Sequence, residues 1–148
     1  MTGTPDQLLL SAARNGDASG IRQALSQGAD INTRGEYGDT ALNLAAQNGS
    51  VEAVDLLLKA GADVENLGGA DMTPLMNSAT GGHLNVVAML LDNGARVSRD
   101  LLSSLQLKVD ILEENAEAGM VNPDAASAWR QFLDYMIGVF KKQNPQNP

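Results

Sequence analysis

Hydrophobic residues recur along the first two-thirds of the chain with the spacing of short amphipathic helices. In residues 41–59 one apolar stripe contains Leu42, Ala45 and Ala46, and the next contains Val51, Val54, Leu57 and Leu58. Positions three and four residues apart lie on one face of an α-helix, so each stripe predicts a helix with one buried face. Together they predict a helix-turn-helix unit.

This unit is repeated with a period of about 33 residues. The tripeptide Gly28-Ala29-Asp30 returns as Gly61-Ala62-Asp63 and again as Gly94-Ala95-Arg96. Other positions keep the same step: Gly16, Gly49 and Gly82; Leu9, Leu42 and Leu75; Ala12-Ala13, Ala45-Ala46 and Ser78-Ala79; Ile31, Val64 and Val97. A period shared by this many positions predicts a stack of similar helix pairs.

The residues that begin and end helices agree with this period. Thr4-Pro5 and Thr73-Pro74 each place a capping hydroxyl before a proline, which is accepted at the first helical position because it needs no donor there. The glycine of each Gly-Ala-Asp or Gly-Ala-Arg tripeptide is expected to end the second helix in the left-handed conformation.

These units resemble the ankyrin-repeat family. Residues 38–49 read GDTALNLAAQNG, residues 73–76 read TPLM, and residues 82–87 read GHLNVV before a leucine-rich helix, against the family's T-P-L-H-x-A core. The resemblance covers about two-thirds of the chain. It implies helix pairs stacked side by side, with extended turns projecting at right angles as fingers. Family members mostly bind proteins through these fingers and the exposed face of each first helix.

Several positions depart from the family pattern. The histidine that follows the leucine is replaced by Asn43 and Met76, so the hydrogen bonds it usually makes between turns must be formed differently or lost. The turn glycine is kept as Gly38 but becomes Asp71, a residue type that tolerates positive φ. The first unit lacks the turn motif, which is typical of a terminal capping repeat.

The repeat register fails after Arg99, so we expect repeats over residues 1–99, divided into an N-terminal capping repeat (1–34) and two further repeats (35–67 and 68–99). A C-terminal helical hairpin is predicted over residues 100–142, followed by a disordered tail, 143–148. The first helix of the hairpin, closed by Gly119, has a stripe of Leu101, Leu105, Val109 and Leu112. The second begins at Asn122-Pro123-Asp124, and its apolar face comprises Trp129, Phe132, Leu133, Met136, Ile137 and Phe140.

The predicted fold class is therefore all-α, an ankyrin-type helix-turn-helix repeat solenoid with a C-terminal hairpin cap. The exposed end of a repeat stack is apolar and needs a cover, which the hairpin is expected to supply. The alternative is that its aromatic stripe is a ligand for a groove or a dimerisation surface.

Composition and charge narrow the functional classes. Only 3% of the 148 residues are aromatic. The sequence includes no cysteine, and this excludes disulfides, thiolate zinc sites and a cysteine nucleophile. The net charge is -8, and residues 110–124 hold five acids without a base, so nucleic acid is not expected as a partner. Residues 1–10 hold no Lys or Arg and only a three-leucine run, so we expect no signal peptide, no membrane and a cytoplasmic protein.

No catalytic, cofactor or metal site is expected. His83 is the single histidine, and its Gly82-His83-Leu84 setting resembles the family's frequent G-H pair between helices. Glu113, Glu114 and Glu117 are interpreted as a solvated helix face. The Gly68-Gly69 and Gly81-Gly82 pairs lack the spacing of a phosphate loop, and no calcium-loop pattern is present.

Tyr37 is the strongest candidate contact, because a large amphipathic ring at a finger tip lies outside any stacked core and tyrosine is favoured in binding hot spots. The other predicted partner-binding residues correspond to the family's variable contact positions: Arg14, Asn15, Arg34, Glu36, Asp39, Gln47, Asn48, Leu67, Ala70, Met72, Thr80 and Gly81. This mixture suits protein recognition better than binding of a small charged metabolite.

The predicted function is that of a non-enzymatic adaptor or regulator, monomeric, whose protein partner carries a basic surface patch. One alternative is a dedicated assembly chaperone or inhibitor of a single client that uses the C-terminal helices, which also leave dimerisation open. The remaining alternative is a small hydrolytic enzyme. It requires a perturbed titratable cluster around His83, Asp55 or Glu52.

Overall fold

The computed structural model describes residues 3–146, and the chain divides into two compact units. The repeat array comprises residues 1–95 and the C-terminal hairpin comprises residues 96–148. The described residues form eight α-helices and one short 3-10 helix, with a single isolated antiparallel bridge between Arg34 and Thr40. The prediction of an all-α repeat fold is confirmed.

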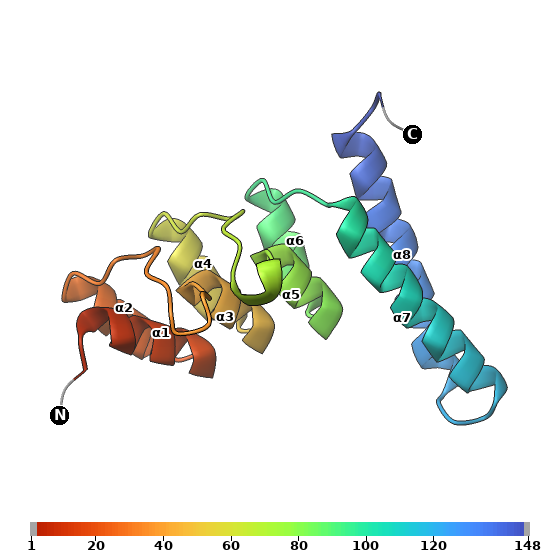
Figure 1. Ribbon diagram of the computed structural model, residues 1–148, viewed down its shortest axis with the longest axis horizontal. Coiled ribbons are helices and arrows are strands. Elements are labelled where there is room, and N and C mark those ends of the chain that lie inside the picture. The colour runs from red at the N-terminus through yellow and green to blue at the C-terminus, as the bar shows by residue number, and fades with distance from the viewer. Residues whose placement is uncertain (1–2, 147–148) are drawn as a thin grey trace. The chain divides into compact units, whose positions relative to one another are not determined.

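The repeat array consists of three helix pairs (Figure 1). Their bounds are α1 (Pro5–Asn15) and α2 (Ala18–Ser26), α3 (Ala41–Asn48) and α4 (Val51–Lys59), and α5 (Pro74–Gly81) and α6 (Leu84–Asp92). The first helices form one layer in which α3 contacts both α1 and α5, and the second helices form another in which α4 contacts α2 and α6. The connections that precede α3 and α5 are extended turns.

Local signals set these helix boundaries as predicted. The hydroxyls of Thr4 and Thr73 each accept a hydrogen bond from the backbone N–H three residues later, and Thr40 does the same before α3. Each of these bonds satisfies one of the free amides of a first helical turn. The glycines that follow α2, α4 and α6 have φ values of 87°, 90° and 91°, in the left-handed region that glycine adopts without a Cβ clash: Gly28, Gly61 and Gly94.

The core repeats with the same period as the sequence. Leu9, Leu42 and Leu75 lie at equivalent positions of the three first helices, and their exposed fractions are 0%, 1% and 1%. Ile21 and Val54 are fully buried in the second helices. Full burial of one such side chain is worth about 1.5–3 kcal/mol, so a thin core of aliphatic residues stabilises each layer through many equivalent contributions.

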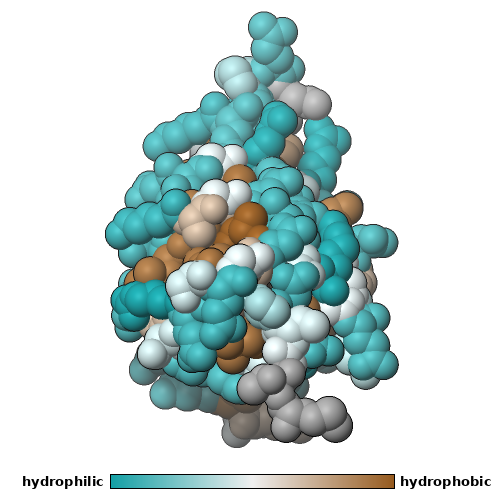
Figure 2. Space-filling model, turned by 90° about the vertical axis from the view of Figure 1, so that its left-hand side faces the viewer, coloured by the Kyte–Doolittle hydropathy of each residue, from teal (hydrophilic) through white to brown (hydrophobic). Residues whose placement is uncertain are grey.

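The first repeat differs from the others at its outer side. Helix α1 has 11 residues, whereas α3 and α5 have 8 each. Seen from the end formed by α1 and α2, the surface shows a hydrophobic patch surrounded by hydrophilic residues (Figure 2). Leu8 and Leu25 stay half-buried, and Ser11 is exposed where the second repeat has the buried Leu44. Such a mixture is typical of a terminal repeat.

The C-terminal hairpin contains α7 (Arg99–Glu117) and α8 (Pro123–Gln143), which pack against each other. The side chain of Asn122 caps α8 by accepting a hydrogen bond from the backbone N–H of Asp124, as predicted. The start of the predicted disordered tail needs correction, because Gln143 is the last residue of α8 and its Oε1 accepts a 2.8 Å hydrogen bond from the backbone N–H of Val97. Residues 147–148 of that predicted tail lie outside the described residues.

An ion pair joins the two helices of the hairpin. The Arg130 guanidinium donates two hydrogen bonds to the Glu113 carboxylate, at 3.0 and 2.7 Å, and lies 3.8 Å from Asp110. The hydrogen bond from Arg130 holds the pKa of Glu113 below its ordinary value of 4.5. Next to this pair, the ammonium of Lys108 lies 3.9 Å from the centre of the Trp129 ring. One of the three glutamates interpreted as a solvated face is therefore bound to the neighbouring helix.

Replacing Glu113 with glutamine should lower the stability of the hairpin slightly at neutral pH. Because the folded pKa of Glu113 is depressed, its stabilising contribution is present above the unfolded value and is lost as the pH falls through the folded value. The difference between the two proteins should therefore vanish under strongly acidic conditions. Fluorescence of Trp129, the single tryptophan, reports unfolding of this unit in urea. Glu114→Gln, at an exposed position without an ion pair among the described residues, should show no such pH-dependent difference.

Candidate functional site

The extended turn before α3, residues 30–40, is called the Tyr37 finger. It is closed by a 2.9 Å hydrogen bond from the backbone N–H of Gly35 to the carbonyl of Asp39 and by the Arg34–Thr40 bridge. Gly38 has a φ of 83°, which allows the chain to reverse immediately after the tip. Tyr37 is 71% exposed, so its ring is presented to solvent as predicted.

The equivalent turn before α5, residues 63–73, is called the Ala70 finger. Its tip is the 3-10 helix η1 (Gly69–Asp71), closed by a 2.8 Å hydrogen bond from the Gly68 N–H to the Met72 carbonyl. Asp71 has a φ of 54°, in the positive region that this residue type tolerates, and Ala70 has a φ of 56°, which no sequence signal predicts. Non-glycine residues in this region are each strained by about 1 kcal/mol or more.

The two fingers are fixed to each other. The guanidinium of Arg34 donates to the carbonyl oxygens of Gly38 at 2.8 Å and Leu67 at 2.5 Å, and also to the side-chain oxygen of Asn66. The backbone N–H of Gly69 donates to Oδ1 of Asp39 at 2.8 Å. The Ala70 finger is therefore held against the Tyr37 finger by side chains from the preceding repeat.

Asn43 replaces the histidine of the family pattern, and its side chain makes hydrogen bonds between the turns. It is fully buried, and its Oδ1 accepts from both the backbone N–H and the hydroxyl of Thr40, at 3.0 and 2.8 Å. Its Nδ2 donates to the carbonyls of Asn66 and Met72 across the repeat boundary, at 3.2 and 3.1 Å. The asparagine amide therefore caps its own helix and holds both ends of the next finger.

The predicted contact residues lie on the fingers and at the ends of the first helices. On the helices, Arg14, Asn15, Gln47, Asn48 and Gly81 are exposed and Thr80 is half-buried. On the fingers, Glu36, Leu67 and Ala70 are exposed, Asp39 and Met72 are half-buried, and Arg34 is exposed although its donors are bound. A 3.1 Å hydrogen bond from Nδ2 of Asn48 to the carbonyl of Arg14 links α3 to α1.

Two depressions follow each other along this surface. The first, of about 250 Å³, lies between α1, α3 and the Tyr37 finger, and is lined by Gln7, Leu10, Ser11, Arg14, Gly35, Glu36, Tyr37, Asp39 and Leu44. The second, of about 490 Å³, lies between α3, α5 and the Ala70 finger, and is lined by Asp39, Gln47, Gly69, Ala70, Met72, Asn77, Thr80 and Gly81. Asp39 lines both depressions. Asn15, Arg34, Asn48 and Leu67 line neither of them.

Part of this lining was not among the predicted contact residues, although the repeat register contains the signal. Ser11, Leu44 and Asn77 lie one period apart and all line a depression. Each stands three residues before a predicted contact on the same first helix, and positions three residues apart share a helix face. Extending the predicted contact positions back by one helical turn would have found them.

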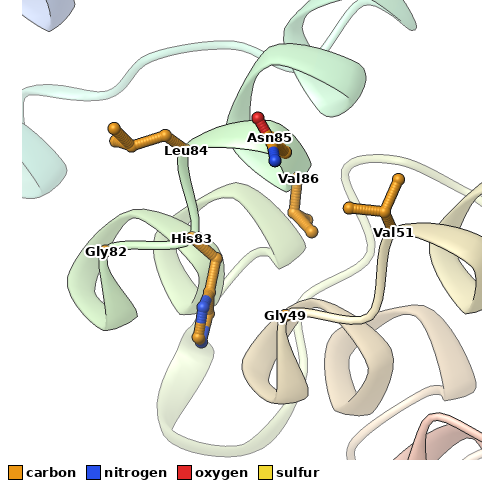
Figure 3. Close-up of a pocket in the computed structure, with 7 residues that line it drawn as sticks. All are labelled: Gly49, Val51, Gly82, His83, Leu84, Asn85 and Val86. Atoms are coloured by element: carbon orange, nitrogen blue, oxygen red, sulfur yellow. The ribbon is translucent and has the colours of Figure 1, made fainter.

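A third depression, of about 370 Å³, lies at the turns that join the helices of the second and third repeats (Figure 3). His83 points from its turn toward Gly49, whereas Leu84 points away, and Nε2 of His83 lies 3.1 Å from the carbonyl oxygen of Gln47. His83 is the only titratable residue of this lining. The ring therefore connects neighbouring repeats, as expected for its Gly-His setting.

The acidic residues that the enzyme hypothesis requires near His83 have other partners. Glu52 pairs with Arg22 at 2.9 Å, and Asp55 pairs with Lys59 at 2.7 Å, both on the exposed surface of the second helices. Within residues 3–146, no group of three or more metal-ligating His, Cys, Asp or Glu side chains comes together. None of the helices that the structure describes is long and apolar enough to cross a membrane.

Stacked helix pairs with projecting turns define an α-helical repeat protein whose exposed features lie on its fingers and first helices. A family model described as ankyrin repeats, in three copies, matches residues 9–100. The chain therefore belongs to the ankyrin-repeat family, whose repeats are protein–protein interaction modules. A search of the curated proteins found no match.

Proposed function

We propose that this protein is an adaptor or regulator that binds a protein partner across its fingers and first helices. The observation that carries the proposal is Tyr37, a ring that is 71% exposed at the tip of a finger and lines a depression. An exposed aromatic residue beside a concave surface is typical of binding hot spots. The cytoplasm remains the expected setting, since a chain without cysteine forms no disulfides.

The charge distribution supports a partner with a basic patch. Residues 1–95 contain eleven acidic and four basic side chains. On the second helices, two acids are neutralised by ion pairs with Arg22 and Lys59. On the fingers, five carboxylates form no ion pair within the described part of the chain: Asp30, Glu36, Asp39, Asp63 and Asp71. The negative electrostatic field of these carboxylates accelerates association with a basic surface and weakens as salt is added.

Affinity capture from native extract tests the binding surface. A protein carrying Tyr37→Ala and Gln47→Ala should lose its partner by about tenfold or more, because truncating a hot-spot residue typically removes 2 kcal/mol or more. The matched control carries Tyr135→Ala and Gln131→Ala, which remove the same two residue types from exposed positions of α8. Partner recovery that stays unchanged in the finger variant would rule out this surface.

The C-terminal hairpin supports a second candidate, a dedicated chaperone or inhibitor of one client. Leu107 and Ile111 lie one turn apart on α7 and are 62% and 49% exposed, and Tyr135 on α8 is 54% exposed. Exposed apolar residues one helical turn apart suit helix-in-groove recognition. Loss of capture in the Tyr135 variant, with capture retained in the Tyr37 variant, would favour this candidate. The capping role of the hairpin stays a prediction.

A further inference from the structure

We propose that the two adjoining depressions recognise one basic segment of the partner. An apolar side chain of the segment fills the first depression against Tyr37, and a lysine or arginine side chain enters the second depression and pairs with Asp39. The inference rests on the proposed function, because it assumes that this surface binds a protein. It adds the chemistry of the recognised segment and a residue that determines specificity.

The first depression has the character of a site for an apolar side chain. Leu10, Leu44 and the exposed ring of Tyr37 form the apolar part of its lining, and the other side chains of the lining are polar or charged: Gln7, Ser11, Arg14, Glu36 and Asp39. Its volume of about 250 Å³ exceeds that of a single aliphatic or aromatic side chain, and it is partly open to solvent. Leu44 is only 4% exposed, so it offers a bound side chain little further surface to cover. Contact with Leu10 and Tyr37 would supply most of the buried apolar area.

The second depression differs because Asp39 is its only charged lining residue. The remaining lining is neutral: Met72 and Ala70 supply apolar surface, and Gln47 and Asn77 supply amides. A lysine or arginine combines a long aliphatic stem with a cationic end, so it can place the stem on apolar surface and the charge on a carboxylate. An anionic side chain would meet Asp39 with no base in the lining to offset the repulsion.

The carboxylate of Asp39 is held ready for such a contact. Its Oδ1 accepts the 2.8 Å hydrogen bond from the Gly69 N–H, which fixes the side chain between the two depressions. The other oxygen, Oδ2, has no hydrogen-bond partner among the described residues. A half-buried carboxylate with one oxygen fixed and one available can bind a cation with little loss of side-chain entropy. Asp39 therefore positions the Ala70 finger and also presents a negative charge to the second depression.

The spacing of the depressions constrains the segment. They belong to neighbouring repeats, and packed helices lie about 8–10 Å apart. An extended chain rises about 3.3 Å per residue, so it covers this distance in about three residues. The basic and apolar anchor residues of the segment should therefore be separated by about three positions along the partner chain.

Selection of a phage-displayed library of random 12-residue peptides against the full-length protein tests the inference. We expect the enriched peptides to contain a lysine or arginine about three positions from a large apolar residue. Their affinity should fall at least severalfold between low and physiological salt, since the contact is electrostatic and partly exposed. Enriched families that lack basic residues, or failure to enrich any family, would overturn the proposal.

Asp39→Asn is the decisive variant, since the amide oxygen can still accept from the Gly69 N–H while the charge is lost. It should weaken the selected peptides about tenfold, and Tyr37→Ala should weaken them by a similar factor. Asp92→Asn removes the same charge from an exposed position on α6 and should leave the affinity unchanged. Hydrogen exchange of residues 63–73 checks that the Ala70 finger stays intact in Asp39→Asn.

The outcomes separate this inference from the proposed function. Peptides that depend on Tyr37 but tolerate Asp39→Asn would overturn the role of Asp39 and leave the finger surface as the binding site. Peptides that tolerate both substitutions would contradict the finger surface itself. If Asp92→Asn weakened peptide binding as much as Asp39→Asn, the effect would be due to the net charge of the protein. That result would also overturn the specific contact with Asp39.

Discussion

Replacing Asn43 with alanine should lower the free energy of unfolding of the repeat array by about 2–4 kcal/mol. The change deletes four hydrogen bonds and leaves the buried N–H and hydroxyl of Thr40 without their partner. A buried donor left unsatisfied is destabilising by about 1–3 kcal/mol, whereas the carbonyls of Asn66 and Met72 are only partly buried and can bind water instead. Denaturant unfolding followed by circular dichroism measures the loss.

Two further substitutions show whether the hydrogen-bond network, rather than the loss of volume, causes this effect. Asn43→His introduces the family's residue, which can accept from Thr40 and donate across the boundary, and it should recover at least half of the lost stability. Asn48→Ala removes an asparagine with one exposed hydrogen bond to Arg14 and should have an effect below about 1 kcal/mol. Equal losses in all three variants would contradict the proposed role of Asn43.

The helices of the repeat array could be predicted from the sequence because their signals are local and repeated. Leu9, Leu42 and Leu75 return every 33 residues, and all three are buried. Each capping threonine precedes its helix directly, so the start of a helix depends on contacts only three residues apart. Periodicity and capping act within one turn or one repeat, so the sequence alone is enough to predict the helices that they define.

The arrangement of the fingers could not be predicted in the same way. Arg34 occupies a variable contact position of the family, and only the structure shows that its donors bind the finger of the following repeat, at Asn66 and Leu67. Asp39 has the same double role through its bond to Gly69. These contacts join residues about 30 positions apart. No local sequence pattern distinguishes a side chain that binds the neighbouring repeat from one that is available to a partner protein.

This fixed pair of fingers has a consequence for binding. A surface that is already ordered loses less conformational entropy when a partner binds, so a modest area can give useful affinity. Variants that loosen the Ala70 finger should therefore weaken binding even where they remove no contact residue. The sharpest case is a glycine at which the two fingers approach closely.

Gly68→Ala should destabilise the repeat array by about 2–3 kcal/mol and displace the Ala70 finger. A Cβ atom at Gly68 would lie 2.5 Å from Oδ1 of Asp39 and 2.7 Å from Cγ of Asn43, both far shorter than ordinary contacts. Both side chains are fixed by hydrogen bonds, so neither can move away without losing them. The backbone at Gly68 has a φ of -96°, so the effect is steric rather than conformational.

Gly35 provides a matched control, because it lies one period before Gly68 at the same position of the Tyr37 finger. A Cβ atom there would make ordinary contacts of 3.6 and 3.7 Å, and Gly35 does not adopt a positive φ. Gly35→Ala should therefore be neutral or stabilising by up to about 1 kcal/mol, through the reduced entropy of the unfolded chain. Equal effects of the two alanines on the denaturation midpoint would mean that the fingers do not approach as closely as described. Adding Asp39→Ala to Gly68→Ala should recover part of the loss, because one of the two clashing side chains is then absent.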